Sequence, residues 1–536
     1  MSGHQNAAAK LSELKDGQMK EVVVEGTSVL LARVGERCYA VGANCTHYGA
    51  PLVEGHLSGN RIVCPWHHAC FDVRNGACEE PPAIDALPSY EVTISEDQIF
   101  VHVPEGGPDR RIPFMTKRDP KDARVFVVLG GGAAGYMAAQ TLREDGFTGR
   151  VVIISKEDRL PYDRPNLSKD YLHGHAEPGW LPLRTEEFFS DFDIEVLRGK
   201  KVQSVDTASR EISFTDGESV KYDSLLVATG AAPRKLPFQN DRQNNVFLLR
   251  SFDDADAVIA SAGPAKRVVI VGSSFIGMEA AASLRQRGCE VTVVTPDETP
   301  MMKALGPEIG REFQKVHERN GVTFRLRESV KDFTGEPDVE WVELGSGERI
   351  RADLVVVGIG VKPVADFLDG VELHADGGLI TDEHMRIGDS VYAAGDIAHV
   401  PDFRTRESVR IEHWRTAMQQ GRTAGHNMAG RPTQFAAVPF FWTTQFDVTL
   451  NYVGHAAAWD EILIEGDISG HDFIAFYIKD FRVMAAAGMN RDRELAFLEE
   501  LIRLNMMPSP AELKDGSFDL LNGSLGRAKT SARAML

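Results

Sequence analysis

Two Cys–His pairs stand near the N-terminus of this 536-residue chain, Cys45 with His47 and Cys64 with His67. The first pair has the spacing C-x-H and the second has C-x-x-H. Two thiolates suit one iron of a [2Fe–2S] cluster, and two neutral imidazoles suit the other iron. Each pair stands on a short stretch, so both of its side chains can reach one cluster. The spacing therefore predicts an iron–sulfur centre that these residues hold.

Zinc is the main competing metal, because two Cys and two His also make a tetrahedral site. A zinc finger, however, usually pairs Cys with Cys and His with His on a much smaller scaffold. The residues beside the pairs, Gly49, Pro51, Leu52 and Phe71, resemble the loops of Rieske domains. His68 departs from that family, which usually has Gly after the second His, and this leaves the potential of the cluster open.

A glycine-rich turn at Gly130, Gly132 and Gly135 follows a strand predicted at Val125–Leu129 and opens a helix to about Glu144. In this context G-x-G-x-x-G is a dinucleotide fingerprint, whose middle glycine lets the backbone approach a pyrophosphate at the helix N-terminus. The alternative is a glycine turn in an α/β domain that binds no nucleotide. We expect a dinucleotide here.

The same strand–turn–helix–strand unit returns further along, where Gly272, Ser274 and Gly277 follow a strand at Arg267–Val271. The repeat indicates a second doubly wound domain. The next strand ends at Thr295, in the position that usually contacts the ribose 2′-hydroxyl of NAD. Acidic residues follow it, and no Arg stands there to bind a 2′-phosphate, so NADH is favoured over NADPH.

From about Glu21 to about Gly454 the chain resembles Rieske-containing apoptosis-inducing-factor-like flavoproteins. Its reductase part is also similar to the ferredoxin reductases of bacterial aromatic-ring dioxygenases. The segments that carry the resemblance are Pro161–Lys169, Ala228–Gly230, Gly277–Glu279, Ala393–Asp396, Glu412–Trp414 and Pro439–Trp442. No C-x-x-C is present, so the disulfide-reductase branch of the superfamily, which needs a redox dithiol, is excluded.

The resemblance assigns roles to residues that lie far apart in the sequence. It implies that FAD is held by Gly130, Gly132, Gly135, Glu157, Arg164, Lys169, Ala228, Thr229, Gly230, Gly395 and Asp396. It implies that the nicotinamide cofactor is held by Gly272, Ser274, Gly277, Glu279, Thr295 and Trp414. The expected catalytic residues are Lys169, Glu279 and Trp414.

In the implied chemistry these residues orient the cofactors and stabilise charge, and none acts as an acid or a nucleophile. Arg164 and Lys169 would stabilise an anionic reduced flavin, with Glu279 facing Lys169 or the nicotinamide. Trp414 would form an aromatic wall beside the stacked rings, and its alternative is a plain core aromatic. Glu157 is a candidate for the adenosine ribose, and its alternative is a solvated surface charge.

These motifs require a multidomain fold. We expect an N-terminal all-β Rieske domain, two doubly wound α/β domains that bind FAD and NAD(P), and a C-terminal α+β domain. The expected bounds are 1–104 for the Rieske domain, 105–122 for a linker, 123–250 with 375–430 for a discontinuous FAD-binding domain, 251–374 for the NAD-binding domain, and 431–536 for the C-terminal domain with a loose tail.

Composition narrows the class of partner. A hydrophobic fraction of 43% with 26% charged residues is ordinary for a soluble globular protein. A formal charge of −19 would repel a phosphate backbone, so nucleic acid is not an expected partner. No apolar run is long enough for a transmembrane segment, and no export signal is visible, so the expected location is the cytoplasm.

We expect an NADH-dependent FAD reductase that relays electrons from NADH through FAD to the [2Fe–2S] cluster and on to a one-electron acceptor. That acceptor could be an oxygenase, a ferredoxin or a quinone. Two alternatives stay open: an NADH oxidase or quinone reductase acting directly from the flavin, and an NADH-responsive redox sensor. The oligomeric state is also open, because the flavin could reach the cluster within one chain or across a homodimer.

Overall fold

The N-terminal module is built from two antiparallel sheets. The computed structural model describes residues 7–239, 243–518 and 520. The first sheet has the order β1-β10-β9-β4-β3-β2, with β1 (Ala9–Lys10), β2 (Met19–Val24), β3 (Thr27–Val34), β4 (Arg37–Gly42), β9 (Ser89–Ser95) and β10 (Gln98–His102). The second has the order β5-β6-β7-β8, with β5 (His56–Ser58), β6 (Arg61–Val63), β7 (Cys70–Asp72) and β8 (Cys78–Glu80).

Strand β3 explains how one short module can have two cores. Successive side chains of a strand point to opposite faces. Leu30 and Ala32 pack in the core that also contains Cys45 and Cys64, whereas the neighbouring residues of β3 pack in a separate core on the other face. Both faces are buried, so the apolar run in β3 is continuous rather than alternating.

The predicted FAD-binding domain contains a six-stranded sheet with the order β13-β12-β11-β17-β31-β30. Its strands are β11 (Val125–Leu129), β12 (Arg150–Ile154), β13 (Ile194–Leu197), β17 (Ser224–Val227), β30 (Arg386–Gly388) and β31 (Val391–Ala393). All neighbours are parallel except β30 and β31. Strand β31 returns to this sheet after the second fingerprint domain, so the sheet is assembled from two segments of the chain.

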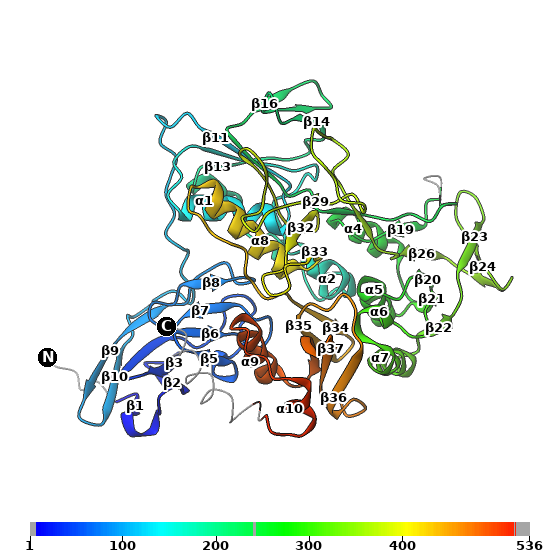
Figure 1. Cartoon of the computed structure of the whole chain (residues 1–536). Helices are drawn as coiled ribbons and strands as arrows, with labels where there is room; N and C mark the ends of the chain where they lie inside the picture. The colour runs from blue at the N-terminus through cyan, green and yellow to red at the C-terminus, as the bar shows by residue number, and fades with distance from the viewer. Residues whose placement is uncertain (1–6, 240–242, 519, 521–536) are drawn as a thin grey trace.

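Helices α1 (Ala133–Glu144) and α8 (Trp414–Met428) pack closely against each other beside this sheet (Figure 1). Gly421 makes the close approach possible, since a Cβ atom there would lie 2.1 Å from the carbonyl oxygen of Ala134. Helix α8 thereby lies beside the glycine-rich turn that opens α1.

The predicted NAD-binding domain has a five-stranded parallel sheet with the order β19-β26-β20-β21-β22. Its strands are β19 (Val246–Leu248), β20 (Arg267–Val271), β21 (Glu290–Thr295), β22 (Thr323–Leu326) and β26 (Leu354–Val357). Strand β19 pairs with β26 although it precedes the predicted start of the domain at residue 251, so the sheet begins earlier than the sequence predicted. The accompanying helices are α4 (Phe252–Ser261), α5 (Phe275–Gln286), α6 (Met302–Leu305) and α7 (Pro307–Arg319), and a small sheet adds β23 (Val330–Thr334), β24 (Trp341–Leu344) and β25 (Arg349–Arg351). Parallel strands are covered on both faces, which accounts for the valine-rich runs at β20 and β26.

Short helices and sheets complete the two halves. The helices are α2 (Asp170–His173) and α3 (Glu186–Asp191). The strands are β14 (Val202–Asp206), β15 (Glu211–Phe214), β16 (Ser219–Lys221), β18 (Ala231–Pro233), β27 (Val361–Pro363), β28 (Leu368–Asp369), β29 (Leu379–Ile380), β32 (Ala398–Pro401) and β33 (Ser408–Arg410). Strand β18 pairs with β27 and β14 with β28, so two strands inside the predicted bounds of the NAD-binding domain pair with strands of the FAD-binding half.

The C-terminal region forms a five-stranded antiparallel sheet with the order β34-β35-β38-β37-β36. The strands are β34 (Phe440–Gln445), β35 (Val448–Gly454), β36 (Glu461–Asp467), β37 (Asp472–Lys479) and β38 (Arg482–Met489), followed by α9 (Asp492–Arg503) and α10 (Pro510–Lys514). The sequence pattern predicts strands at Val438–Phe441, Asp447–Val453, Phe473–Ile478 and Phe481–Met484. It misses β36, because β36 is an edge strand with no fully buried residue. The predicted loose tail lies almost entirely outside the described residues.

The N-terminal module lies beside the C-terminal sheet, with α9 between them (Figure 1). The predicted linker, 105–122, is fully described and contains no helix or strand. Its second part is bonded to the FAD-binding domain through Thr116 and Asp119, whose amides donate to Arg143 and Thr148. Within the described ranges, no helix is both long and apolar enough to cross a bilayer.

Candidate functional site

The two predicted cluster loops are copies of one another in backbone hydrogen bonding. In the first loop the Cys45 amide donates to the Ala50 carbonyl (2.8 Å), and the Gly49 amide donates to the Cys45 carbonyl (2.9 Å). The second loop repeats both bonds from Cys64, at 2.9 and 3.2 Å. Each predicted Cys ligand therefore opens a tight turn that contains its predicted His partner.

The two predicted histidine ligands meet, and both side chains are half-buried. The Nδ1 atoms of His47 and His67 lie 3.0 Å apart. Burial lowers the pKa of His47 to about 3 and holds the pKa of His67 well below its ordinary value, which keeps both rings in the neutral form that binds metal.

The two cysteines complete the donor set. A hydrogen bond to Cys64, together with burial, raises the pKa of the Cys45 thiol well above its ordinary value. Burial works against ionisation of Cys64, but the bond from Cys45 and backbone amides outweigh it and lower the Cys64 pKa. Two paired sulfurs and two paired neutral imidazoles, one of each from each loop, fit the [2Fe–2S] cluster that the spacing predicted.

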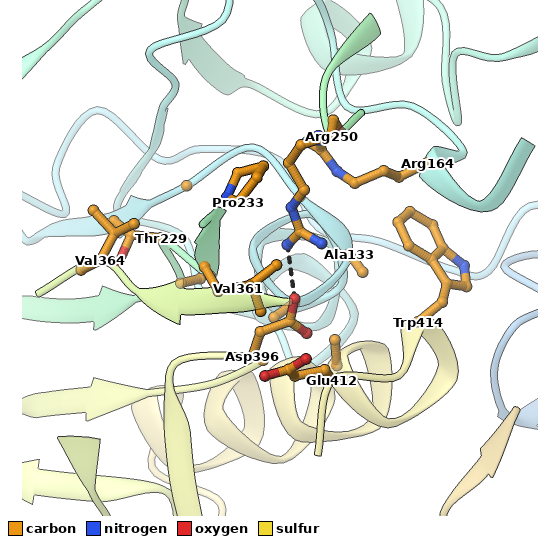
Figure 2. A pocket seen from close by; sticks show the side chains of 18 of the residues that line it. Ala133, Arg164, Thr229, Pro233, Arg250, Val361, Val364, Asp396, Glu412 and Trp414 are labelled. Carbon is orange, nitrogen blue, oxygen red and sulfur yellow. Dashed lines mark hydrogen bonds and ion pairs between the residues drawn. The ribbon is translucent and has the colours of Figure 1, made fainter. Parts of the chain in front are cut away.

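A cleft of about 840 Å³ lies between the two doubly wound domains and reaches the C-terminal sheet (Figure 2). Most predicted cofactor residues line it: Gly130, Gly132, Glu157, Arg164, Lys169, Ala228, Thr229, Gly230, Ser274, Glu279, Gly395, Asp396 and Trp414. The turn at Gly132 has room for a pyrophosphate, because a Cβ atom there would meet no described heavy atom within 4 Å. The cleft therefore fits the dinucleotides that the fingerprints predicted.

Four predicted cofactor residues are not among the described residues that line this cleft: Gly135, Gly272, Gly277 and Thr295. A Cβ atom on Gly135 would lie 1.9 Å from the Gly130 carbonyl oxygen, and one on Gly277 would lie 2.3 Å from that of Gly272. Thr295 is buried and accepts a hydrogen bond from Ser273 (2.9 Å). Gly135 and Gly277 thus lie where the turn leaves no room for a side chain, whereas Thr295 is bonded to the turn beside it.

Lys169 and Glu279 meet across the two domains, as the resemblance implied. The Lys169 Nζ atom lies 3.0 Å from Glu279 Oε2, and Ser168 Oγ donates to the same oxygen (2.5 Å). Thr443, from the C-terminal sheet, donates to the other carboxylate oxygen (2.7 Å). The Glu279 carboxylate is buried, so it joins three parts of the fold and holds the Lys169 cation at the cleft.

Two further ion pairs line the cleft. Arg164 Nη2 lies 2.9 Å from Glu157, whose carboxylate also accepts from the Tyr162 hydroxyl (2.6 Å). Glu157 is therefore a paired, half-buried group rather than a solvated surface charge. Arg250 Nη2 lies 2.7 Å from Asp396 (Figure 2), and no sequence motif pointed to this arginine.

An arginine also approaches the expected NAD ribose position, although none stands there in the sequence. Arg327 comes from the end of β22, and its Nη2 atom lies 2.9 Å from Glu298 Oε1. Both side chains are largely exposed. The local sequence after Thr295 could not show this arginine because it belongs to the neighbouring strand.

Trp442 ends a segment that carries the family resemblance, which implies no role for it, and it lies between the two predicted redox sites. Its ring lies 4.2 Å from the ring of His67 and 6.4 Å from that of His47, measured between centroids. The same side chain lines the cleft, with Lys169 Nζ at 5.9 Å from its ring centre. One aromatic ring thus contacts a predicted cluster ligand and lines the cleft.

Tyr48 makes a second connection from the cluster loop to the cleft wall. Its ring stacks on His47 at 4.0 Å, and its hydroxyl donates to the Asp163 carboxylate. The same hydroxyl accepts from Asn166 Nδ2 (2.8 Å). Asp163 and Asn166 belong to the Pro161–Lys169 segment, so the N-terminal module is docked on the segment that carries Lys169.

Three family models match successive parts of the chain. They are the pyridine nucleotide-disulphide oxidoreductase family (residues 124–421), the Rieske [2Fe-2S] domain (4–91) and the reductase C-terminal domain (440–522).

Relatives and solved structures resemble the chain over different extents. The chain is 37% identical over 508 residues to apoptosis-inducing factor 3 of Homo sapiens, with 92% of this chain and 83% of that protein covered. It is 33% identical to rhodocoxin reductase of Rhodococcus erythropolis, with 74% and 93% covered. The crystal structure of the covalent putidaredoxin reductase–putidaredoxin complex matches with a TM-score of 0.71 at 30% identity, covering 74% of this chain and 97% of that one.

Proposed function

The chain belongs to the pyridine nucleotide-disulphide oxidoreductase family as an FAD- and NAD(P)H-dependent oxidoreductase with a Rieske [2Fe-2S] domain, and from this we propose that it feeds its own cluster. In this proposal NADH is the electron donor and the cluster passes single electrons to an external acceptor. An oxygenase, a ferredoxin or a quinone would have suitable chemistry. Relatives that are named as ferredoxin reductases support the reductase part of the proposal.

FAD, when bound, supplies the exchange between the two-electron chemistry of NADH and the one-electron chemistry of a [2Fe–2S] cluster. The chain's own residues bind and orient. Gly130 and Gly132 open the N-terminus of α1 towards a pyrophosphate, where unpaired backbone amides favour an anion. Lys169, held by Glu279, places a cation at the cleft, and Trp414 provides an apolar wall.

The observation that carries the proposal is the position of Trp442. The side chain contacts His67, a predicted cluster ligand, and lines the cleft of the same chain. Tyr48 adds a polar contact from the other cluster loop to the cleft wall. These contacts support delivery of electrons to the cluster within one chain, with no need for a second copy.

The first test is an anaerobic titration of the reconstituted protein with NADH, followed by visible absorbance and low-temperature EPR. A reduced Rieske signal that grows in as the flavin absorbance bleaches supports the proposal. Flavin reduction with a cluster that stays oxidised overturns it and favours an oxidase or a sensor. Because delivery is within one chain, the rate of cluster reduction should not change when the protein is diluted.

A substitution at Trp442 tests electron transfer to the cluster separately from flavin reduction by NADH. Trp442→Ala should slow cluster reduction while flavin reduction by NADH stays near the parent rate, because the ring beside His67 is lost. Trp341→Ala is the matched control, since that tryptophan lies on β24 beside Arg349 and does not line the cleft described here. Equal rates of cluster reduction in both variants would count against a path beside Trp442.

A further inference from the structure

The second cluster loop contains a residue in a backbone conformation that favours glycine. His68 has φ +56°, and it occupies the position that Gly49, with φ +79°, occupies in the first loop. A non-glycine residue in this region is uncommon and costs backbone energy unless its surroundings hold it. Contacts of the His68 side chain would have to stabilise this backbone conformation.

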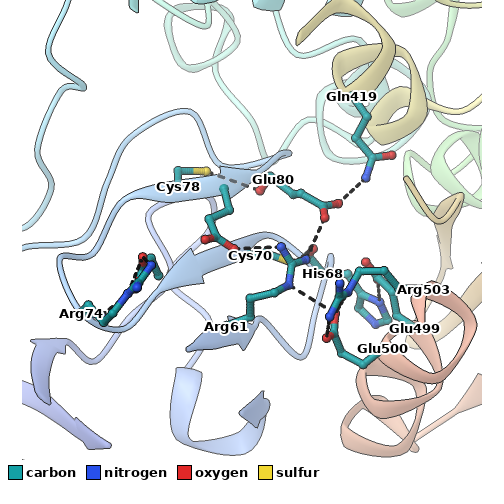
Figure 3. A network of polar contacts seen from close by, with 12 residues as sticks. Arg61, His68, Cys70, Arg74, Cys78, Glu80, Gln419, Glu499, Glu500 and Arg503 are labelled. Carbon is teal, nitrogen blue, oxygen red and sulfur yellow. Dashed lines mark hydrogen bonds and ion pairs between the residues drawn. The ribbon is translucent and has the colours of Figure 1, made fainter. Parts of the chain in front are cut away.

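The His68 side chain is fully buried and faces Glu499 of the C-terminal domain (Figure 3). Its Nδ1 atom lies 2.5 Å from Glu499 Oε2, on helix α9. Its ring stacks on Phe440 of β34 with 4.0 Å between centroids. The residue that follows cluster ligand His67 is thus attached to the C-terminal domain by a hydrogen bond and a ring contact.

Glu499 in turn binds a fully buried arginine from the FAD-binding domain. Arg415, on α8, has its Nη2 atom 2.8 Å from Glu499 and 3.0 Å from Glu80, which belongs to the N-terminal module. The same guanidinium donates to the carbonyls of Pro81 (2.8 Å) and Val438 (3.1 Å). One arginine therefore bonds to all three units that meet here.

The network continues to a second arginine on the N-terminal module. Arg61 Nη2 lies 2.7 Å from Glu80, and its Nε atom lies 3.4 Å from Glu500 of α9. Gln419, one turn after Arg415, donates to Glu80 (2.6 Å). Buried charges are costly unless they are paired, so this cluster is stable only while the three units stay together.

We propose that these residues (Arg61, His68, Glu80, Arg415, Gln419, Glu499 and Glu500, here called the Arg415 clamp) hold the N-terminal module permanently on the reductase, and that His68 is the positioning residue that ties the cluster loop to the clamp. The module then serves as a fixed part of the enzyme rather than a mobile carrier. The benefit of this arrangement rests on the proposed function, because a fixed cluster is useful when it is fed within one chain.

The test uses the full-length holoenzyme with a protease site inserted between Gly106 and Gly107, which are exposed. After cleavage, the parent fragments should stay together as one particle at micromolar concentration. Arg415→Met should raise the dissociation constant of the fragments on the order of 100-fold, because it leaves Glu80 and Glu499 buried without their partner. Glu499→Gln is the second variant if Arg415→Met loses FAD or folds poorly. Its fragments should also separate more readily.

Arg143→Met is the matched control. Arg143 is equally buried, but its guanidinium donates to the carbonyls of Phe147, Gly149, Phe192 and Asp193, all within the FAD-binding domain. Arg143→Met should lower stability without weakening the association of the fragments. A dissociation constant for Arg415→Met and Glu499→Gln within about threefold of the parent value, which is under 1 kcal/mol, would overturn the clamp.

His68 is tested by its local signature. His68→Gly should retain the cluster, speed hydrogen exchange at residues 64–70 and alter the EPR g values. His68→Asn, which tolerates this backbone conformation and keeps a donor, should restore part of the protection. Exchange and EPR spectra that match the parent in His68→Gly would refute the positioning role. Cleaved fragments that stay together while NADH fails to reduce the cluster would refute the proposed function and leave the clamp standing.

Discussion

The two doubly wound halves carry the same strand–turn–helix unit, and the space around their glycines can be compared position by position. At the first glycine the halves agree. Gly130 has φ +125°, and a Cβ atom there would lie 2.1 Å from the carbonyl oxygen of Ala228. Gly272 has φ +104°, and its Cβ atom would lie 2.3 Å from that of Gly358. In both halves the end of the neighbouring strand in the sheet lies so close to the turn that only glycine fits.

The halves differ at the middle position. A Cβ atom on Gly132 would meet no described heavy atom within 4 Å, and the other half has Ser274 there. The third glycines agree again, because a Cβ atom on Gly135 or Gly277 would collide with the carbonyl of its own turn. The fold therefore imposes the first and third glycines, whereas the middle one depends only on how closely a ligand approaches.

The most damaging change should be alanine at either first glycine. Gly130→Ala and Gly272→Ala each add a backbone clash to an unfavourable φ, with an expected loss of about 3–5 kcal/mol. Gly130→Ala should lose FAD, whereas Gly272→Ala should keep FAD and lose NADH binding. Thermal unfolding and flavin content measure both effects. Normal FAD content in Gly130→Ala would show that the two turns are less rigid than the comparison implies.

Breaking the contact between the halves should have the next largest effect. Glu279→Leu leaves Lys169 half-buried without its anion and removes the acceptor of Ser168 and Thr443, at an expected cost of about 2–4 kcal/mol. NADH-dependent flavin reduction should fall with it. Glu279→Gln keeps the shape and is the control, with a smaller loss. If Glu279→Leu were as stable as Glu279→Gln, the polar contacts of the Glu279 side chain would contribute less to stability than its packing.

The acids near the two adenosine ribose positions should behave unequally. Glu157 is half-buried and bonded to Arg164 and Tyr162, so Glu157→Gln should weaken FAD retention by about 1–2 kcal/mol. The exposed pair of Glu298 with Arg327 is worth only about 0–1 kcal/mol. Glu298→Gln should leave stability unchanged. It should raise kcat/KM for NADPH, by less than about tenfold, because Arg327 would then be free to bind the 2′-phosphate. Steady-state kinetics with both nucleotides would detect the difference.

The smallest effect should come from exchanging the middle residues. Gly132→Ser and Ser274→Gly should each change unfolding stability by less than about 0.5 kcal/mol, because the position faces open space. Gly132→Ser should nevertheless reduce FAD affinity, while Ser274→Gly should leave NADH affinity close to the parent value. Flavin release measures the FAD affinity of Gly132→Ser, and an NADH titration measures the NADH affinity of Ser274→Gly. A large loss of stability in Gly132→Ser would contradict the open space seen around that turn.

Local sequence was enough for the elements and residues whose chemistry is contained in one short segment. Each cluster loop needs only its own turn, and each fingerprint needs only a strand, a glycine turn and a helix. The strand at Val125–Leu129 and the helix ending at Glu144 have the predicted bounds. Strand β36 escaped prediction because its side chains are partly exposed and give no clear period.

What the sequence determined by itself is therefore the Rieske and dinucleotide-binding families of the domains, with Cys45, His47, Cys64 and His67 as the predicted cluster ligands. Tertiary structure alone decided which surfaces these motifs share. Trp442 meets His67, Tyr48 meets Asp163, and His68 meets Glu499, although each partner lies far away in the sequence. The physical reason is that such contacts depend on how whole domains pack, and packing depends on shape and buried charge that no short motif contains.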